Sequence, residues 1–312
     1  MKKILITGGT GFLGKHIAKK LKSNYKVIIS GRNNSINKLA EDETGCEAIS
    51  MNIDNIESVK DVFNHFKPKI IIHAAASKYV DSSEKYPLEC IDTNIIGSQN
   101  IARVSIDKKI QTVIGISTDK TAPPVLNIYG LSKAIMERMF CNLSNVNDTK
   151  FACVRFGNIP WSTGSVFPIW KKMMEENNLI ESTGPDMRRF FLSADNATNL
   201  VIRVLENISI FNGKTVSMKM KSSKISNILD IWCNNYNTSW KKIDKRIGDK
   251  YDEYLIGQGE IQYASKIIIN NIIHYIIDFS KNDKIEIREP ISTLNAEKFS
   301  KKEILKLIKF EK

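Results

Sequence analysis

The chain has no apolar run of about eighteen residues or more, although 42% of its 312 residues are hydrophobic. A membrane-spanning helix needs about twenty mostly apolar residues, so we expect a chain that does not span a membrane. The most apolar stretch, 267–277, is interrupted by Asn270 and Asn271 and is expected to form a buried strand or helix. The N-terminus also lacks the apolar segment and small-residue cleavage site of a signal peptide.

Cysteine and histidine are scarce, with five and four residues respectively. The cysteines are odd in number, show no C-x-x-C spacing and mostly lie in apolar surroundings. This pattern favours a reduced, cytoplasmic protein with buried thiols over a disulfide-bonded secreted one. No cluster of histidine and cysteine has the spacing of a metal site, so we expect no bound metal.

The sequence also lacks a cluster of basic residues interleaved with aromatic ones, although its net charge is +12. A nucleic-acid-binding module needs such a cluster, whereas here the lysines are scattered along the chain. We therefore expect no nucleic-acid partner. The charge is interpreted as a solvated basic surface, which would also suit small ligands that carry phosphate groups.

Short apolar segments alternate with helical patterns through the first half of the chain. The predicted strands are 3–7, 25–30, 48–54, 69–76, 113–116 and 151–156. This alternation predicts an α/β fold with a Rossmann-like, doubly wound parallel sheet, and a long helix is expected near 87–105.

The alternation ends near residue 157, which suggests two domains. We expect a dinucleotide-binding Rossmann domain over 1–157 and a smaller, mainly substrate-binding domain over 158–312. No Pro-, Gly- or Ser-rich linker separates them, so the two should interleave. A helix near 194–206 is the candidate to return to the sheet.

A glycine-rich turn follows the first predicted strand. Gly9, Gly11 and Gly14 form a G-x-G-x-x-G pattern, and a helical pattern continues through Leu21. Glycines permit the tight turn and the close approach of a pyrophosphate, which then faces the helix N-terminus. Between a strand and a helix, this pattern is strong evidence for a dinucleotide site. The cofactor-binding residues predicted here are Gly8, Thr10, Gly11, Phe12, Leu13 and Gly14.

The ends of the following strands indicate which dinucleotide binds. A Gly-Arg-Asn turn follows the second strand, without the acidic residue that binds the ribose hydroxyls of NAD. Arg32 can pair with a 2′-phosphate, which favours NADP, or it is an exposed arginine of a turn. Asp54 can accept a hydrogen bond from the adenine amine or cap the helix from Ile56. Small residues that leave room for a cofactor follow the fourth strand, at Ala74, Ala75 and Ala76.

A group of polar residues follows the strand at 113–116. Ser117, Thr118, Asp119 and Lys120 come directly after it, and a helical pattern begins near Asn127. In open α/β sheets, ligands bind at the edge where strands end and helices begin. This segment is therefore a candidate for the reacting part of the site.

Tyr129 and Lys133 are four residues apart, so on a helix they share one face. A nearby ammonium favours a phenolate, so we expect Lys133 to lower the pKa of Tyr129. A tyrosine made acidic in this way can take a proton from a sugar hydroxyl. The Y-x-x-x-K spacing alone arises by chance in many helices, and only its position beside the 117–120 segment supports a catalytic interpretation.

The glycine pattern and the Tyr–Lys spacing resemble those of extended short-chain dehydrogenases/reductases. Further segments are similar to the UDP-N-acetylglucosamine 4,6-dehydratases of bacterial polysaccharide and glycan synthesis: 73–80, 92–97, 117–120, 154–158, 185–191 and 246–250. The Ser-Thr-Asp-Lys segment is the most specific of them. Many other extended reductases have no Asp–Lys pair there, and hexose 4,6-dehydratases that act on non-acetylated sugars carry Asp–Glu.

The resemblance implies a bound NADP that is reduced and reoxidised within one turnover. It implies that Tyr129 takes the C4 hydroxyl proton and that Thr118 holds the C4 oxygen. Lys120, as a neutral amine, would remove the C5 proton, and Asp119, protonated, would protonate the departing C6 hydroxyl. An acid and a base side by side suit this elimination.

The resemblance also assigns the remaining binding residues. Further cofactor contacts are Lys78, Asn94, Tyr129 and Lys133. The substrate-binding residues are Lys78, Thr118, Tyr129, Asn158, Arg189, Arg246 and Asp249. The implied partner is a UDP-sugar, and the family also implies a homo-oligomer, a dimer or higher, in which the helices after residues 84 and 127 pair across the interface.

Some features separate this chain from other members of the family. Members that retain the C5 configuration usually replace the active tyrosine and carry membrane segments. This chain keeps Tyr129 and shows no such segment, so it resembles the soluble, C5-inverting group. The loop from Asp119 to Tyr129 is one residue longer than usual, and Thr163 stands where an arginine is common. These departures affect substrate detail and the pose of the tyrosine.

Two rival functions use parts of the same pattern. A nucleotide-sugar 4-epimerase or 4-ketoreductase needs Tyr129, Lys133 and the cofactor but has no use for Asp119 and Lys120. A non-catalytic NADP-binding scaffold would keep the Rossmann half and lose the catalytic pair. The intact Tyr129 and Lys133 argue against a scaffold.

Overall fold

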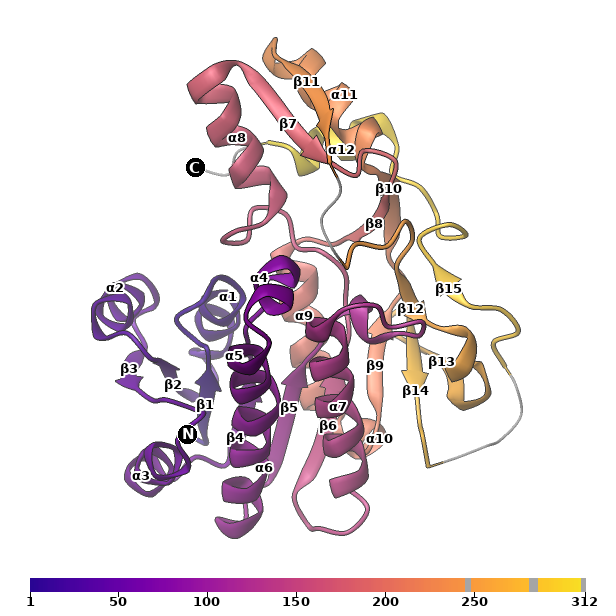
Figure 1. The fold of residues 1–312 in the computed structure, drawn as a ribbon. Helices are drawn as coiled ribbons and strands as arrows, with labels where there is room; N and C mark the ends of the chain where they lie inside the picture. Colours follow the sequence, from indigo (N-terminus) through magenta and orange to yellow (C-terminus); the bar gives the residue numbers. More distant parts are fainter. Residues whose placement is uncertain (245–247, 281–285, 310–312) are drawn as a thin grey trace.

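The computed structural model describes residues 1–244, 248–280 and 286–309. These residues form a nine-stranded sheet and a smaller lobe above its upper edge (Figure 1). From one edge to the other, the strands of the sheet are β13 (Ala264–Ile269), β14 (Ile272–Ile277), β9 (Thr215–Met218), β6 (Lys150–Val154), β5 (Thr112–Ile116), β4 (Ile70–His73), β1 (Lys3–Thr7), β2 (Lys26–Gly31) and β3 (Glu47–Ser50).

The order of the strands reverses beside β1. The chain runs from β1 outward through β2 to β3, and then crosses to β4 and continues in the other direction. All pairs from β3 to β9 are parallel, and only β14 and β13 add to the sheet in antiparallel fashion. The predicted doubly wound α/β fold is therefore confirmed, and the reversal point is where such sheets bind ligands.

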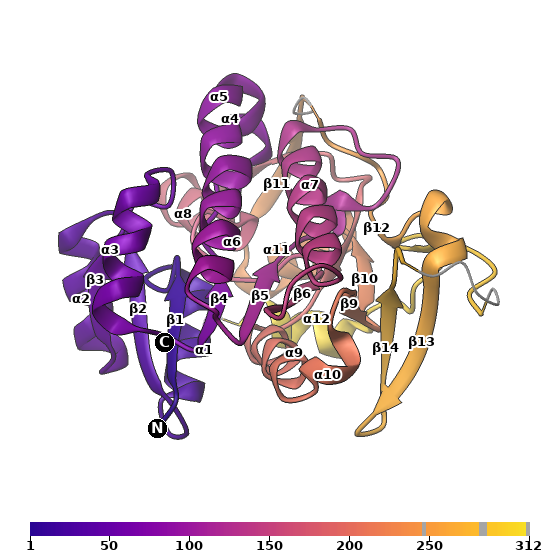
Figure 2. The ribbon, with the colours of Figure 1, turned by 90° about the horizontal axis from the view of Figure 1, so that it is seen from below.

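Helices cover both faces of the sheet (Figure 2). One face carries α1 (Phe12–Leu21), α2 (Asn34–Thr44), α9 (Ala194–Glu206) and α10 (Ile208–Phe211). The other carries α3 (Ile56–Phe66), α6 (Gly97–Asp107) and α7 (Ile128–Leu143). Because side chains alternate along a strand, Ile4 and Ile6 of β1 pack in the first layer, and Leu5 packs in the second.

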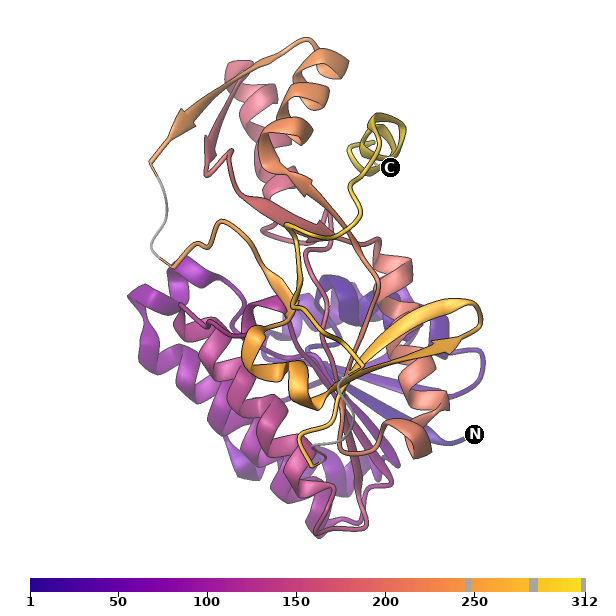
Figure 3. The same cartoon turned by 90° about the vertical axis from the view of Figure 1, so that its right-hand side faces the viewer.

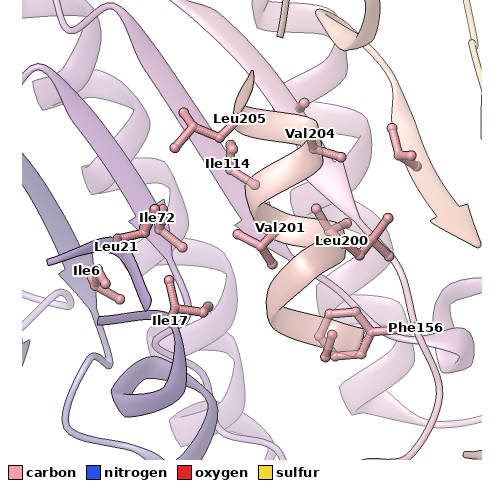
Figure 4. Close-up of a cluster of buried hydrophobic side chains, with 14 of the residues drawn as sticks. Ile6, Ile17, Leu21, Ile72, Ile114, Phe156, Leu200, Val201, Val204 and Leu205 are labelled. Carbon is pink, nitrogen blue, oxygen red and sulfur yellow. The ribbon is translucent and has the colours of Figure 1, made fainter. Parts of the chain in front are cut away.

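The helix expected near 194–206 does return to the sheet. α9 spans Ala194–Glu206, and its Leu200, Val201 and Val204 are buried against β5, β6 and β9. Figure 4 shows these side chains in one cluster with Ile17 of α1 and Ile114 of β5. The apolar positions of α9 lie three and four residues apart and form the buried stripe of an amphipathic helix.

Three predicted strands end earlier than expected, among them 151–156, which is a strand only as far as Val154, the end of β6. The segment 48–54 is a strand only over β3, and 69–76 only over β4, which stops at His73. β4 ends because its partner β1 ends at Thr7, where the chain turns away at Gly8 with φ of 63°. The alanines that follow are left as a loop at the upper edge of the sheet, where they can face a ligand.

The long helix expected near 87–105 is interrupted. After α4 (Val80–Lys85), Pro87 begins α5 (Pro87–Ile91), a π-helical turn follows over Asp92–Ile96, and α6 continues from it. Proline suits a first helical turn because its missing N–H would have no partner there.

The apolar stretch 267–277 is two strands rather than the one strand or helix that was expected. β13 and β14 form an antiparallel hairpin, visible in Figure 3 at the side of the sheet. Asn270 and Asn271 make its turn with φ of 50° and 61°. Asparagine tolerates this left-handed conformation, which two-residue hairpin turns require at both positions.

The smaller lobe has its own apolar core around Trp232, which stacks with Trp161 and meets Trp170 edge-on. Its elements are α8 (Val166–Asn177), β7 (Leu179–Thr183), β8 (Arg188–Phe191), β10 (Lys221–Lys224), α11 (Ile225–Tyr236), β11 (Ser239–Ile243) and α12 (Lys301–Leu307). A further pair, β12 (Tyr254–Ile256) and β15 (Ile291–Ser292), lies between lobe and sheet. The second half of the chain thus builds the lobe but also supplies α9, β9, β13 and β14 to the sheet.

No helix in the described part of the chain is both long enough and apolar enough to cross a membrane.

Candidate active site

A cavity of about 990 Å³ lies where the upper edge of the sheet meets the smaller lobe. The loops after β1, β4 and β5 line it from below, and residues of α8, β7 and β8 line it from above. Its size suits a dinucleotide together with part of a second ligand, since pockets for drug-sized molecules hold about 300–1,000 Å³.

The glycine turn after β1 forms a cradle that admits no side chain. A Cβ on Gly8 would lie 2.6 Å from the Ala75 nitrogen, and a Cβ on Gly14 would lie 2.5 Å from the Gly8 oxygen. Gly11 caps α1 without a side-chain hydrogen bond, so the first N–H groups of the helix remain available for an anion. The residues present therefore fit the diphosphate of a dinucleotide. All the predicted residues of this turn line the cavity: Gly8, Thr10, Gly11, Phe12, Leu13 and Gly14.

Arg32 lines the cavity, whereas Asp54 lies beside Arg32 but is not among the lining residues. The side chain of Arg32 is 60% exposed, and its guanidinium lies 3.9 Å from Asp54 Oδ2. The Oδ1 atom of Asp54 is buried without a hydrogen-bond partner among the described residues, and burial raises the pKa of this carboxyl. Asn55, not Asp54, caps α3, because its side chain accepts from the backbone of Glu57 and Ser58. Of the two roles considered for Asp54, the cap is wrong.

The alanines after β4 and Lys78 line the cavity as predicted, whereas Asn94 lies behind its wall. The alanines concerned are Ala74, Ala75 and Ala76. Lys78 Nζ donates to the Thr163 carbonyl at 2.6 Å, which links the two parts of the chain. Asn94 is fully buried, and its Nδ2 donates to the Ser77 carbonyl and to Ser132 Oγ, both at 2.9 Å. It positions the loop and α7 rather than facing the cavity.

Thr118, Asp119 and Lys120 form a compact polar group at the end of β5. Thr118 Oγ1 donates to Asp119 Oδ1 at 3.1 Å, and Lys120 Nζ donates to the same oxygen at 3.0 Å. Thr118 and Lys120 line the cavity. Asp119 is fully buried behind them, so in this structure the lysine and the threonine stand between its carboxyl group and a ligand.

The protonation of Lys120 differs from the expectation of a neutral amine. Burial opposes its positive charge, but the carboxylates of Asp119 and Glu253 outweigh this and raise the pKa of Lys120 well above its usual value. Without a bound ligand, Lys120 is therefore an ammonium in an ion pair with Asp119. Moving one proton from Nζ to Oδ1 would convert the pair into the neutral amine and carboxylic acid.

Tyr129 stands at the start of α7, close to Lys120. Asn127 caps the helix by accepting from the Gly130 nitrogen at 2.7 Å. Gly130 allows tight packing, since a Cβ there would lie 2.4 Å from the Lys120 carbonyl oxygen. Burial raises the pKa of Tyr129 to about 12, and the charge of Lys120 opposes this increase.

The expected acidifying effect of Lys133 on Tyr129 is wrong for this structure. Lys133 is buried on the same helix and lines the cavity, but its Nζ contacts Met136 Sδ at 3.2 Å. Burial lowers the pKa of Lys133 itself to about 8. The cation that favours the phenolate is Lys120, because the fold brings the end of β5 against the first turn of α7.

The predicted substrate residues meet on the lobe side of the cavity. Asn158, Arg189 and Asp249 line it. Arg189 donates to the Lys250 carbonyl at 2.9 Å and lies 3.6 Å from Asp249 Oδ1. Asn158 Nδ2 donates to the Phe190 carbonyl at 3.2 Å. Arg246 lies outside the described residues.

Residues 4–274 match the sequence profile of a protein family, which is described as "polysaccharide biosynthesis protein". This chain belongs to that family.

Individual relatives cover most of the length of this chain. An uncharacterized membrane protein of Methanocaldococcus jannaschii is 34% identical over 99% of the chain and 96% of its own length. The inverting UDP-N-acetylglucosamine 4,6-dehydratase of Campylobacter jejuni is 32% identical over 83% of the chain and 78% of its own. The crystal structure of Pen from Bacillus thuringiensis superposes with a TM-score of 0.90 at 27% identity, covering 98% of this chain and 96% of Pen. The resemblance inferred from the sequence is thereby confirmed.

The structure adds residues to the site that the sequence motifs did not reveal. From the smaller lobe, the cavity is lined by Trp170, Met173, Glu181, Thr183 and Ile243. Glu253 lies behind the cavity wall with its Oε1 atom 3.6 Å from Lys120 Nζ. The only sequence signal for Glu253 was an acidic residue three positions after the 246–250 motif.

A buried ion network holds α7 against the segment that follows β12. Arg155 is 1% exposed and donates to both carboxylate oxygens of Glu137 on α7 and to both of Glu260. It also donates to the Leu255 carbonyl at 2.8 Å. Bidentate pairs of this kind define geometry as well as energy, so the network orients the helix that carries Tyr129.

Proposed function

We propose that this protein is a nucleotide-sugar 4,6-dehydratase that converts UDP-N-acetylglucosamine with inversion at C5 and uses tightly bound NADP, in the synthesis of a surface glycan sugar in the cytoplasm. The observation that carries the proposal is the Asp119–Lys120 pair, with its atoms 3.0 Å apart, beside Thr118 and Tyr129. An epimerase or ketoreductase moves a hydride at C4 and has no use for such a pair. The Campylobacter jejuni relative supports the choice of substrate.

The glycine cradle, the alanine loop and Arg32 would hold NADP, which when bound supplies an acceptor for the C4 hydride and returns that hydride to C6. Arg32 is the reason for proposing NADP over NAD, because a guanidinium fork suits a phosphate. Arg189 and Lys78 would contact the diphosphate of the substrate, and Asn158 and Asp249 would contact its polar groups.

Tyr129, once its phenol has lost its own proton, would accept the proton of the C4 hydroxyl as C4 is oxidised, with Thr118 holding the C4 oxygen. The resulting ketone acidifies the C5–H bond. Lys120 Nζ then accepts the C5 proton, the C6–O bond breaks, and the leaving hydroxide takes a proton from the Asp119 carboxyl to form water. A C5–C6 double bond conjugated with the C4 ketone remains, so atoms and electrons balance.

The ion pair in the structure is the product state of that elimination step. Before the step, one proton must have moved from Lys120 to Asp119, which gives the neutral amine and the carboxylic acid. Afterwards the amine has gained a proton and the carboxyl has lost one, so the pair returns to the form seen here. Asp119 lies behind Lys120 and Thr118, so the proton of its carboxyl group would reach the sugar through one of these two side chains.

Inversion at C5 follows from the same chemistry. Deprotonation makes C5 planar, and the face that is reprotonated decides the configuration of the product. Tyr129 is the residue that the inverting members keep, so we expect a UDP-linked 2-acetamido-2,6-dideoxy-L-arabino-4-hexulose.

Incubation with UDP-N-acetylglucosamine in deuterated water tests the proposal. We expect mass spectrometry to show the loss of one water, and NMR to show deuterium at C5 and the L-arabino configuration. A D-xylo product would contradict inversion and leave dehydration intact. Interconversion at C4 without loss of water would establish the epimerase alternative. If neither reaction occurs, the non-catalytic scaffold is the alternative that remains.

We further propose that two copies of the chain associate through α5 and α7. Leu88 on α5 is 74% exposed, and Leu131 and Ile135 on α7 are 50% and 47% exposed. The two helices contact each other, and exposed apolar side chains that gather on neighbouring elements mark association sites. Light scattering should show a dimer or larger oligomer for the wild type and a smaller species for Leu131→Asp. Val146→Asp, at an exposed apolar residue beyond the end of α7, should leave the mass unchanged.

A further inference from the structure

Glu253 is a buried carboxylate with no role in the chemistry described so far. It is 2% exposed and lies just before β12. Its nitrogen donates to Thr293 Oγ1 at 3.1 Å, and its carbonyl oxygen accepts from the Thr293 nitrogen at 2.9 Å. The backbone at this position is therefore held on both sides.

The carboxylate of Glu253 is directed at the catalytic lysine. Its Oε1 atom lies 3.6 Å from Lys120 Nζ, and its Oε2 atom lies 3.8 Å from Lys250 Nζ. Oε2 has no hydrogen-bond partner among the described residues. A buried carboxylate with an incompletely satisfied oxygen destabilises the fold, so its presence calls for a reason other than stability.

Several other charged groups face this carboxylate and the lysine. They are Asp119 after β5, Tyr129 on α7, Arg189 on β8 and Lys250 in the preceding loop, with Asp249 reached through Arg189. Burial raises the pKa of Glu253, and Lys120, Arg189 and Lys250 oppose this increase. Lys120 Nζ is thus within 4 Å of two carboxylates, of which only Asp119 exchanges a proton with it in the proposed elimination.

We propose that Glu253 is a positioning residue for Lys120. The carboxylate of Glu253 holds Lys120 Nζ at the cavity wall and makes the neutral lysine a stronger base toward C5–H. Glu253 does not line the cavity, so it acts through the lysine rather than on the sugar. When Lys120 accepts the C5 proton, the new ammonium forms 3.6 Å from a carboxylate that is already in place. Charge that is preorganised in this way stabilises the transition state because nothing has to move as the reaction proceeds.

This inference rests on the proposed dehydratase reaction, and a single-turnover experiment separates the two. The full-length protein carrying NADP is mixed with UDP-N-acetylglucosamine, and the absorbance of the reduced nicotinamide is followed across pH. Its rise reports oxidation at C4, and its decay reports the elimination that allows the hydride to return. Loss of water by the wild type tests the proposed function, and the variants test Glu253.

For Glu253→Gln we expect an unchanged rise and, on the high-pH plateau where Lys120 is neutral in both proteins, a decay about 10- to 100-fold slower, because the ammonium that forms loses a carboxylate 3.6 Å away. Removing the carboxylate lowers the pKa of Lys120, so the pH midpoint of the decay should move down. A unit charge 3.6 Å away changes a pKa by about one unit at an effective dielectric constant of about 80 and by about three units at about 20. Glu253→Asp keeps the charge and should restore the midpoint toward the wild-type value. Lys250→Met removes a cation near the same carboxylate and should move the midpoint upward.

Glu260→Gln is the matched control, because Glu260 is a buried carboxylate seven positions further along that pairs with Arg155 instead of Lys120. It should lower thermal stability without moving the midpoint.

A slower decay of Glu253→Gln at an unchanged midpoint would reduce Glu253 to a structural residue and overturn the inference, as would wild-type decay. If Glu253→Gln does not fold, the opposite behaviour of Glu253→Asp and Lys250→Met still decides. If the wild type oxidises C4 but never loses water, the proposed function fails and this inference fails with it.

Discussion

Replacing Lys120 by alanine is expected to stop the loss of water and to leave oxidation at C4 in place. In the wild type, Nζ is the only amine in contact with the Asp119 carboxylate among the described residues, and it lines the cavity. Without it no base reaches C5, so the elimination should slow by about 10²- to 10⁴-fold, the usual contribution of a general base. Reduced nicotinamide should then accumulate on the enzyme when UDP-N-acetylglucosamine is added.

Tyr129→Phe should give the opposite spectroscopic result. This variant lacks the group that accepts the C4 hydroxyl proton, so oxidation at C4 should slow by about 10²- to 10⁴-fold and no reduced nicotinamide should appear. Because burial raises the pKa of Tyr129 to about 12, the phenol holds its proton at neutral pH before a ligand binds. The rate of the first hydride transfer should therefore increase as the pH rises.

Lys60→Ala serves as the control for both variants, because Lys60 is a surface lysine on α3 that pairs with Glu57 one turn away. It should behave as the wild type. Turnover of Lys120→Ala at the wild-type rate would show that Lys120 is merely a wall residue and would remove the basis for a dehydratase. Absence of reduced nicotinamide in both Lys120→Ala and Tyr129→Phe would mean that Lys120 is needed before elimination begins.

Arg32→Asp is expected to weaken the binding of NADP by about 30- to 1,000-fold. A hydrogen bond to a charged group contributes about 1.5–3 kcal/mol, and the new carboxylate would repel a 2′-phosphate in addition. Every 1.4 kcal/mol corresponds to about tenfold in affinity. The binding of NAD should change much less, since NAD carries no phosphate at that position, and an aspartate there can accept from the ribose hydroxyls.

Calorimetric titration of the protein, stripped of nucleotide, with NADP and with NAD measures this directly. Asp54, with its Oδ2 atom 3.9 Å from Arg32, already partly balances the guanidinium charge, so Asp54→Asn should leave the preference for NADP intact. Lys60→Asp makes the same charge change at a distant surface site and should have no effect. Equal affinities of the wild type for NADP and NAD would refute the role assigned to Arg32.

The parts of the site that the sequence predicted well are those defined by local backbone geometry. Gly8 and Gly14 sit where a Cβ would collide with backbone atoms, and such positions are visible in any sequence as a glycine spacing. Tyr129 and Lys133 share a helix, and both line the cavity. The helix Ala194–Glu206 was recognisable from its apolar periodicity, because a helix repeats every 3.6 residues whatever it packs against.

Two interactions that sequence reasoning misjudged depend on how different elements of the fold pack together. Lys133 was expected to lower the pKa of Tyr129, but Lys120 is the cation that opposes the increase of this pKa by burial, because β5 and α7 converge at the cavity. Asn94 was expected to face the cofactor, yet its hydrogen bonds to Ser77 and Ser132 place it behind the wall. Spacing along the chain does not reveal which of several neighbouring polar side chains points into a cavity.

By itself, the sequence determined the doubly wound sheet and the glycine cradle and pointed to the side chains that we propose to react, because these depend on periodicity, on conformations that only glycine tolerates and on adjacent residues. Only the tertiary structure decided the charge states and the depth of those side chains. Asp119 is buried behind Lys120, and Glu253 reaches that lysine across more than a hundred residues of chain. Protonation depends on burial and on charges within a few ångströms, and both are properties of the packed molecule.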